Sequence, residues 1–372
     1  MCVKKFLAWC RGEVVLLTAA VCAAVSAIAV PPSAAYLGYI DLRVLCLLLC
    51  LMAVVAGLQR CGVFLVLSQR LLAGEKNVRL LQLLLVLLPF FSSMLITNDV
   101  ALITFVPFAL EALGMAGLTR RAIPVVTMQT IAANLGSMAT PIGNPQNIYL
   151  YSTFNIDLGT FLATLAPYGI LGLAASLLPC VLIPNEPLAA NELRETPINR
   201  HLLAVYSVLF ALALACVGRI VSWELCTIVT IVACLVFDRS VLRHIDYSLL
   251  ATFVCFFIFV GNLKHVDALV TALQGLLAGR EVLVSALTSQ VISNVPAAIM
   301  LSGFTHNATG LLIGTNIGGL GTPVASLASL ITLRIYARSG NAQTSRYLLY
   351  FLVYNVILLA LFLTLASVLG QA

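Results

Sequence analysis

The feature that most constrains this chain is a series of apolar segments, each about long enough to cross a lipid bilayer. Nine of them run over residues 14–30, 42–58, 122–150, 161–183, 202–218, 221–237, 247–261, 311–335 and 347–369. A spanning helix needs about 20 predominantly apolar residues. Only 9% of the 372 residues are charged, against about 25% in soluble domains. The sequence therefore predicts an all-α polytopic membrane protein with about nine full crossings.

Two further apolar stretches, residues 79–113 and 281–304, are interrupted in the middle by polar residues. The interruptions are Thr97, Asn98 and Asp99 in the first stretch, and Ser293 and Asn294, followed by Pro296, in the second. The second stretch has about 24 residues, too few for two crossings of about 20 residues each, so we expect a re-entrant helical hairpin. The first stretch is long enough to be a hairpin or two crossings.

The order of these segments occurs twice. Each copy has two crossings, an amphipathic interfacial piece (residues 60–74 or 264–279), a broken hairpin, a long crossing with Gly and Pro in its middle, and a last crossing. We predict one transmembrane domain, residues 1–372, with repeat 1 at 14–183, a linker and connecting helix at 184–220, and repeat 2 at 221–369. Four crossings in each repeat and one connecting helix make repeat 2 inverted, as in secondary transporters.

The distribution of Lys and Arg agrees with this topology. With the N-terminus in the cytoplasm, sixteen of the twenty fall on the inner side, and four, Arg43, Arg219, Lys264 and Arg280, fall on the outer side. This is the bias that the positive-inside rule expects. We therefore predict an inner-membrane protein with a cytoplasmic N-terminus, whose first hairpin opens from the cytoplasm and second from outside. A cleavable signal peptide is the alternative for residues 14–30, but the topology needs this segment as a helix.

The same motif follows each interrupted stretch. It reads Asn134-x-Gly136-x-x-x-Thr140-Pro141 in the first copy and Asn316-x-Gly318-x-x-x-Thr322-Pro323 in the second. The first copy continues with further helix breakers and carboxamides at Gly143, Asn144, Pro145 and Asn147. Because proline removes a backbone donor and glycine tolerates unusual backbone angles, each long crossing should unwind here. Its unpaired N–H and C=O groups, facing a cavity, can bind an ion or a substrate.

The deep polar residues also have a structural explanation. Buried asparagines can join helices through hydrogen bonds worth about 0.6 to 2 kcal/mol each, but Asn98, Asn134, Asn294 and Asn316 occupy matching breaks, which favours a binding site. Asp99 can cap the second arm of its hairpin, or it can hold Na⁺ or exchange a proton and so couple transport to an ion. The matching residue in the second copy is Val295, so only one copy provides a carboxylate.

Other chemistries lack support. The positive charges are dispersed between apolar segments, which argues against nucleic-acid binding, and the eleven cysteines contain no CxxC pair. No metal-ligand spacing, Walker motif or dinucleotide fingerprint occurs. We therefore expect no enzymatic activity, no catalytic residue and no cofactor or metal, except Na⁺ as a coupling ion.

The motifs resemble those of the ion-transporter superfamily, which includes arsenite permeases, citrate-transporter-like proteins and divalent-anion/sodium symporters. The resemblance covers essentially the whole chain, is closest to bacterial anion permeases, and is carried by residues 97–101, 139–147 and 293–296. It implies a homodimer in which a mobile transport domain, holding hairpins and broken helices, moves like an elevator against a scaffold. It also implies two ion sites, one formed by Asn98, Asn134 and the 143–147 loop, the other by Asn294, Asn316 and Thr322.

The hairpin tips depart from one branch of this superfamily. Divalent-anion symporters carry Ser-Asn-Thr at both tips, whereas Asp99 here would repel a dicarboxylate unless Na⁺ or H⁺ neutralised it, which favours the arsenite-permease branch. We therefore predict a secondary active transporter that moves a small anionic solute, such as arsenite, a carboxylate or a similar inorganic anion, coupled to H⁺ or Na⁺. A Na⁺/H⁺ antiporter and, less favoured, an intramembrane enzyme are the alternatives.

Overall fold

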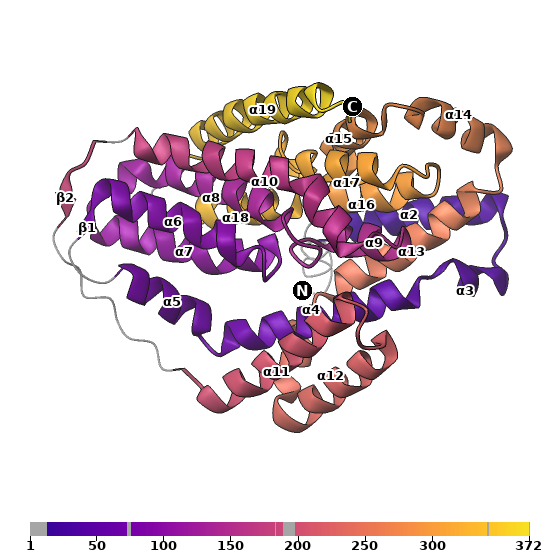
Figure 1. Cartoon of the computed structure of the whole chain (residues 1–372), viewed down its shortest axis with the longest axis horizontal. Coiled ribbons are helices and arrows are strands. Elements are labelled where there is room, and N and C mark those ends of the chain that lie inside the picture. The colour runs from indigo at the N-terminus through magenta and orange to yellow at the C-terminus, as the bar shows by residue number, and fades with distance from the viewer. Residues whose placement is uncertain (1–12, 73–75, 183, 189–197, 341, 372) are drawn as a thin grey trace, which may run out of the picture.

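The computed structural model describes residues 13–72, 76–182, 184–188, 198–340 and 342–371, and these residues are almost entirely helical (Figure 1). The helices of the first half are α2 (Val14–Ala29), α3 (Ala35–Tyr39), α4 (Leu42–Arg60), α5 (Val63–Leu72), α6 (Val78–Ser92), α7 (Asn98–Met115), η1 (Thr119–Arg121), α8 (Ala122–Ser137), α9 (Pro145–Thr153) and α10 (Leu158–Val181). Those of the second half are α11 (Arg200–Val217), α12 (Trp223–Phe237), η2 (Arg239–His244), α13 (Tyr247–Leu263), α14 (Asp267–Leu277), α15 (Glu281–Ile292), α16 (Asn294–Ser302), α17 (Ala308–Ile317), η3 (Pro323–Ala325), α18 (Leu327–Ala337) and α19 (Thr344–Val368).

The helices end and begin where the sequence predicted breaks. The interrupted stretches form the helix pairs α6–α7 and α15–α16, with Asn98 and Asn294 as the first residues of the second helices. The long crossings are likewise interrupted, between α8 and α9 and between α17 and α18, where glycine and proline disfavour a continuous helix. The amphipathic pieces form α5 and α14. That either pair is a re-entrant hairpin stays a prediction.

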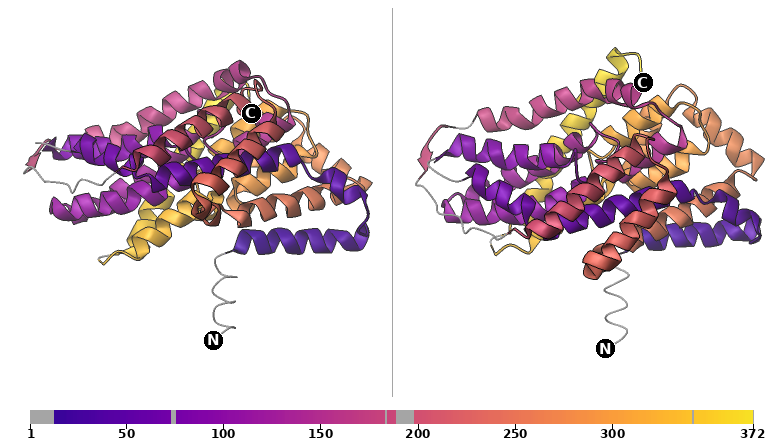
Figure 2. Two further views of the ribbon diagram at one scale, coloured as in Figure 1. Left: turned by 90° about the horizontal axis from the view of Figure 1, so that it is seen from below. Right: turned by 60° about the horizontal axis from the view of Figure 1, so that its bottom comes forward.

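The helices form two groups, seen from three directions in Figures 1 and 2. In the first, which we call the scaffold group, α4 packs against α11 and α12, and α13 packs against α2 and α3. In the second, the hairpin group, α6 and α7 pack against α8, α15 packs against α17, and α10 and α19 cover one side. The groups meet where α9 contacts α4 and α16 contacts α13. The largest buried apolar cluster contains residues of both groups, so the interface is part of the core.

The chain is a helical membrane protein. Five described helices, α4, α7, α10, α11 and α19, are long and apolar enough to cross a membrane, or six if the bent pair α13–α14 counts as one span. Large apolar side chains such as Ile170, Val208 and Ile228 are exposed on the outside, where lipid can cover them. The prediction of about nine crossings arranged as an inverted repeat stays a prediction.

The structure adds two small elements to the all-α expectation. Helix α3 lies between α2 and α4, in the short stretch between the first two predicted crossings. The two-residue strands β1 (Lys76–Asn77) and β2 (Pro187–Leu188) pair antiparallel, because two extended connections pass each other there and their backbone groups pair. Predictions that concern Lys4, Lys5, Arg11, Arg194 and the linker residues 189–197 lie outside the described residues.

Candidate functional site

The tip of the first helix pair lies against the break between α8 and α9. The backbone N–H of Asn98 donates to the carbonyl oxygen of Gly143 (3.2 Å), and its side-chain amide donates to Asn134 Oδ1 (2.8 Å). Asn98 Oδ1 in turn accepts from the N–H of Asp99 (3.0 Å). Asn98 therefore connects this tip to both sides of the break.

The tip of the second helix pair has the same local hydrogen bond. Asn294 Oδ1 accepts from the N–H of Val295 (3.0 Å). Ser293 has a φ of 74°, in the left-handed region that residues other than glycine rarely adopt, and such strain clusters at functional sites. The Asn294 amide lies beside Gly319, since a Cβ on Gly319 would come 3.1 Å from Asn294 Nδ2. This tip therefore approaches the break that follows α17.

Carboxamides hold the first break, residues 138–144. Asn147 Nδ2 donates to the carbonyl oxygens of Ser137 (3.3 Å) and Thr140 (3.1 Å), and Asn144 Nδ2 donates to Ser137 Oγ (2.6 Å). The bond to Ser137 satisfies the carbonyl group of the last residue of α8. The Thr140 carbonyl, which lies in the break, also accepts from the N–H of Gly143 (3.3 Å). Pro145 opens α9, where a missing N–H costs nothing.

The second break, residues 318–326, is held by Gln290 of α15, a residue that the sequence did not single out. Gln290 Nε2 donates to the carbonyl oxygens of Gly318 and Leu320, both at 2.9 Å, and its Oε1 accepts from the N–H of Thr322 (2.9 Å). Only the position of Gln290, four residues before Asn294, could have indicated it. Gln290 thus closes a break as Asn147 does in the first half.

Each break also contacts the other half of the chain. Asn316 Nδ2 donates to Asn147 Oδ1 (2.7 Å). Asn134 Nδ2 donates to Ser329 Oγ (3.4 Å), and Asn134 Oδ1 accepts from Ser326 Oγ (3.1 Å). These five side chains are buried, as is Asn98. We call Asn98, Asn134, Asn147, Asn316, Ser326 and Ser329 the central cluster.

The contacts of the two halves occur at the same sequence spacing. Asn147 lies thirteen residues after Asn134, and Ser329 lies thirteen residues after Asn316. The bonds Asn316 to Asn147 and Asn134 to Ser329 are therefore equivalent. In each, the first asparagine of one motif donates to the residue thirteen positions after the first asparagine of the other motif. This spacing is the signal by which Ser329, which the sequence did not single out, could have been found.

The hairpin contacts match in the same way. Thr140 Oγ1 donates to the carbonyl oxygen of Met94 (2.5 Å), four residues before Asn98. Thr322 Oγ1 donates to the carbonyl oxygen of Gln290 (3.0 Å), four residues before Asn294. The two threonine positions of the motifs therefore tie each break to the hairpin of its own half.

Asp99 is placed differently from the asparagines. It is half-buried in the first turn of α7, where a negative charge is favourable to the helix dipole. Its carboxylate accepts no hydrogen bond and forms no ion pair among the described residues, so a capping hydrogen bond does not explain it. Asp246, which caps α13 of the scaffold group, is the ionisable group that interacts electrostatically with Asp99. The charge of Asp246 in the scaffold group therefore disfavours a negative charge on Asp99 in the hairpin group.

The remaining predicted residues lie in the turns around the central cluster. Thr97 precedes α7, Pro141 lies in the first break, Pro296 lies in the first turn of α16, and Pro323 opens η3. Gly136 and Gly318 bring α8 and α17 close to α6 and α15, since a Cβ on either would overlap those helices. The structure thus brings the predicted residues of both halves together, and their role in binding stays a prediction.

Comparison with known proteins identifies the family. The model of a family described as citrate transporters matches residues 6–309. The chain belongs to this citrate transporter family. An uncharacterized transporter of Methanocaldococcus jannaschii is 33% identical over 273 residues, covering 71% of the chain and 73% of the relative.

Two further similar proteins come from a bacterium and a plant. An inner membrane protein of Escherichia coli is 32% identical over 301 residues, covering 77% of each protein. A silicon efflux transporter of Oryza sativa is 32% identical over 139 residues, 37% of this chain and 28% of the relative. This citrate transporter family member is therefore a membrane transporter and not an enzyme.

Proposed function

We propose that the protein is a secondary active transporter that moves a small anionic solute across the inner membrane, coupled to H⁺ or Na⁺. The observation that carries the proposal is the central cluster, in which the first hairpin tip and both helix breaks meet through buried carboxamides and hydroxyls. Unwound helices at mid-membrane form the substrate and ion sites of secondary transporters. The matched contacts of the two halves support an inverted repeat.

Two groups in this region suit an ion. Asn316 Oδ1 is buried and accepts no hydrogen bond from a described residue, and a neutral carboxamide oxygen suits Na⁺. Asp99 has a carboxylate without a hydrogen-bonding partner among the described residues, next to the first tip. We propose that Asn316, with Asn294 and Thr322, holds Na⁺, and that Asp99 couples transport by binding Na⁺ or H⁺.

The class of solute is proposed from the names of the family and of one relative, and from the charge of Asp99. The family name supports a carboxylate, and the name of the rice relative supports a small inorganic oxyacid. The aspartate at the first tip favours the second class, because it would repel a dicarboxylate unless an ion neutralised it. Arsenite or a similar inorganic species is therefore the first candidate, and a carboxylate is the second.

The two helix groups suggest how the site alternates between the sides. We propose that the hairpin group moves as an elevator against the scaffold group, in a homodimer with the N-termini in the cytoplasm. The electrostatic interaction between Asp99 and Asp246 crosses the boundary between these groups. A motion of the hairpin group would therefore change the electrostatic environment of the coupling residue.

Transport by purified protein in liposomes tests the proposal. Vesicles with an imposed pH or Na⁺ gradient would be assayed for uptake and efflux of arsenite, silicic acid, citrate and succinate. Gradient-dependent movement of one solute supports the proposal, and absence of movement for all solutes contradicts it. Solute-independent exchange of Na⁺ for H⁺, read with a pH-sensitive dye inside the vesicles, would instead support the Na⁺/H⁺ antiporter.

A further inference from the structure

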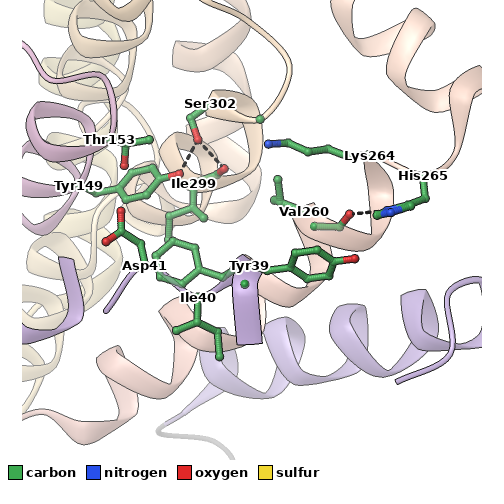
Figure 3. Close-up of a pocket in the computed structure, with 14 residues that line it drawn as sticks. Tyr39, Ile40, Asp41, Tyr149, Thr153, Val260, Lys264, His265, Ile299 and Ser302 are labelled. Carbon is green, nitrogen blue, oxygen red and sulfur yellow. Dashed lines mark hydrogen bonds between the residues drawn. The ribbon is translucent and has the colours of Figure 1, made fainter. Parts of the chain in front are cut away.

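A cavity of about 450 Å³ lies between the two helix groups, apart from the central cluster (Figure 3). The scaffold group lines it with residues 38–41, the last two turns of α13 and the two residues that follow α13. The hairpin group lines it with the second halves of α9 and α16. Both α9 and α16 have nine residues, about 13 Å at 1.5 Å per residue, and both start at a break or a tip. Within α9, the lining begins at Tyr149, two residues after Asn147 of the central cluster, and continues along the second half of the helix to Thr153.

Two basic side chains, Lys264 and His265, and one acidic side chain, Asp41, line the cavity. His265 Nδ1 is bonded to the carbonyl oxygen of Gly261 (3.0 Å), whereas Lys264 and Asp41 are not paired with each other. Lys264 extends into it from the end of α13, and Asp41 lies on another wall, beside Tyr149 (Figure 3). Asp41 Oδ1 accepts from the N–H of Val44 (3.0 Å) and so caps α4, which leaves its second oxygen available. Among the described residues, Lys264 forms neither an ion pair nor a side-chain hydrogen bond.

The hydroxyl groups of the cavity form a directed chain. Ser302 Oγ donates to the carbonyl oxygen of Ile299 (2.9 Å), so the 2.6 Å bond between Ser302 Oγ and the Tyr149 hydroxyl has Tyr149 as its donor. The Tyr149 oxygen is then left with acceptor capacity only. The Tyr149 oxygen and Asp41 are both acceptors that line the cavity, and Lys264 offers donors from another wall.

We propose that this cavity binds a small zwitterion, such as a free amino acid, with its ammonium group at Asp41 and Tyr149 and its carboxylate at Lys264. Lys264 and Asp41 carry opposite charges on different walls of the cavity, so a ligand with one charge of each sign matches them. A monoanion of the same size would gain the contact with Lys264 but face repulsion from Asp41. The volume lies within the range of about 300 to 1,000 Å³ of small-molecule sites. This binding is separate from whatever solute the central cluster holds.

Three molecules of nearly identical shape test the proposal. Alanine, lactate and propionate differ only in an ammonium group, a hydroxyl group or a hydrogen atom on the same carbon. Equilibrium binding of each radiolabelled compound to the purified full-length protein in detergent gives the affinities. Alanine should bind about tenfold more tightly than lactate or propionate, as expected for one added charge-assisted hydrogen bond.

The variant Asp41→Asn reverses this preference. Asparagine caps a helix as well as aspartate does, so α4 is retained while the charge is lost. Alanine affinity should fall about tenfold, and lactate affinity should rise because the repulsion is removed. Asp157→Asn is the matched control, since Asp157 also caps a helix, α10, and does not line the cavity. Its affinities should equal those of the wild type.

A variant of Lys264 tests the proposed contact with the carboxylate of the ligand. Lys264→Gln should lower the affinities for alanine and lactate together, whereas Arg280→Gln, which changes another exposed cation, should leave both unchanged. The thermal unfolding midpoint of each variant shows whether it is folded. Wild-type binding of lactate in preference to alanine, binding of neither, or alanine binding that survives Asp41→Asn would each overturn the zwitterion site. Because binding is measured directly, these outcomes stand whether or not the protein transports a solute.

Discussion

Asn316 donates its side-chain amide to Asn147 Oδ1 at 2.7 Å, across the boundary between the two halves of the chain. Asn147 itself donates to the carbonyl oxygens of Ser137 and Thr140, so it closes the first break. A single hydrogen bond therefore links the motif of the second half to the unwound segment of the first. The oxygen of the Asn316 carboxamide, Oδ1, is buried and accepts no hydrogen bond from a described residue. It is therefore available to bind a transported or coupling ion.

Replacing Asn316 tests whether this oxygen binds Na⁺. Asn316→Ala should raise the Na⁺ concentration for half-maximal transport about tenfold, because one ligand is lost. The control is Asn355→Ala in α19. Asn355 is also buried, donates to the carbonyl of Phe351 at 2.9 Å, and its Oδ1 accepts no hydrogen bond from a described residue. It should lose stability without a change in Na⁺ dependence. Equal shifts in the two variants would assign Asn316 a structural role only.

Asp99→Asn separates ion coupling from solute movement. The carboxylate has no described hydrogen bond to lose, so the variant should fold with an unfolding midpoint close to that of the wild type. Transport should continue down a solute gradient but no longer respond to an imposed pH or Na⁺ gradient. Glu111→Gln changes an exposed acid on the same helix and should keep the wild-type response. A wild-type ion dependence of Asp99→Asn would leave only the helix-dipole role.

Much of the central cluster could be predicted because helix breakers are visible in an apolar sequence. Asn98 of the cluster stands out among apolar neighbours, as does Asn294 at the other tip, and the structure begins a helix at each. The contacts between halves could not be predicted in this way, since they depend on how the helices pack. Ser329 looks like an ordinary small residue of an apolar helix, and only its contact with Asn134 gives it a partner in the other half.

The cavity between the two helix groups could not be predicted from the sequence either. Asp41 and Lys264 are separated by most of the chain, and each has an ordinary place in a loop next to a helix. Their approach depends on the packing of α13 against α2 and α3 and of α16 against α13. The role of Gln290 could not be predicted for the same reason. Its amide, in the middle of α15, closes the second break only because packing brings it to the carbonyl groups of Gly318 and Leu320.

Two glycines of the motifs set how closely the helices approach. A Cβ on Gly136 would overlap the backbone at Phe90, and one on Gly318 would come within 2.9 Å of Ala286. Gly136→Ala and Gly318→Ala should each destabilise the protein by about 1 to 3 kcal/mol, the range for overpacking. Gly114→Ala, in α7 with open space around it, should be neutral or stabilising by up to about 1 kcal/mol. Thermal unfolding midpoints in detergent compare the three variants.

At the end of the scaffold group, Arg60 and Asp238 form an ion pair of 2.8 Å that joins α4 to the end of α12. Burial alone would raise the pKa of Asp238, but hydrogen bonds from Ser240 and Arg60, with a further one from Tyr206, outweigh burial and hold this pKa below its usual range. A carboxyl group with a lowered pKa stabilises the folded state above its unfolded pKa of about 4. This stabilisation is lost as the pH falls through the folded value.

The prediction is therefore a loss of stability in acid that depends on Arg60. The guanidinium is 37% exposed, so Arg60→Ala should cost about 1 kcal/mol or less at pH 7, as for other exposed pairs. The difference in unfolding midpoint between the variant and the wild type should start to shrink as the pH falls toward the unfolded pKa of about 4. It should be lost once the pH is below the lowered pKa of folded Asp238, because protonation then removes the pair in the wild type as well. Arg338→Ala, which removes an exposed arginine with no described partner, should leave the midpoint unchanged at every pH. A constant difference between Arg60→Ala and the wild type across this range would show that Arg60 acts through packing of its stem instead of its charge.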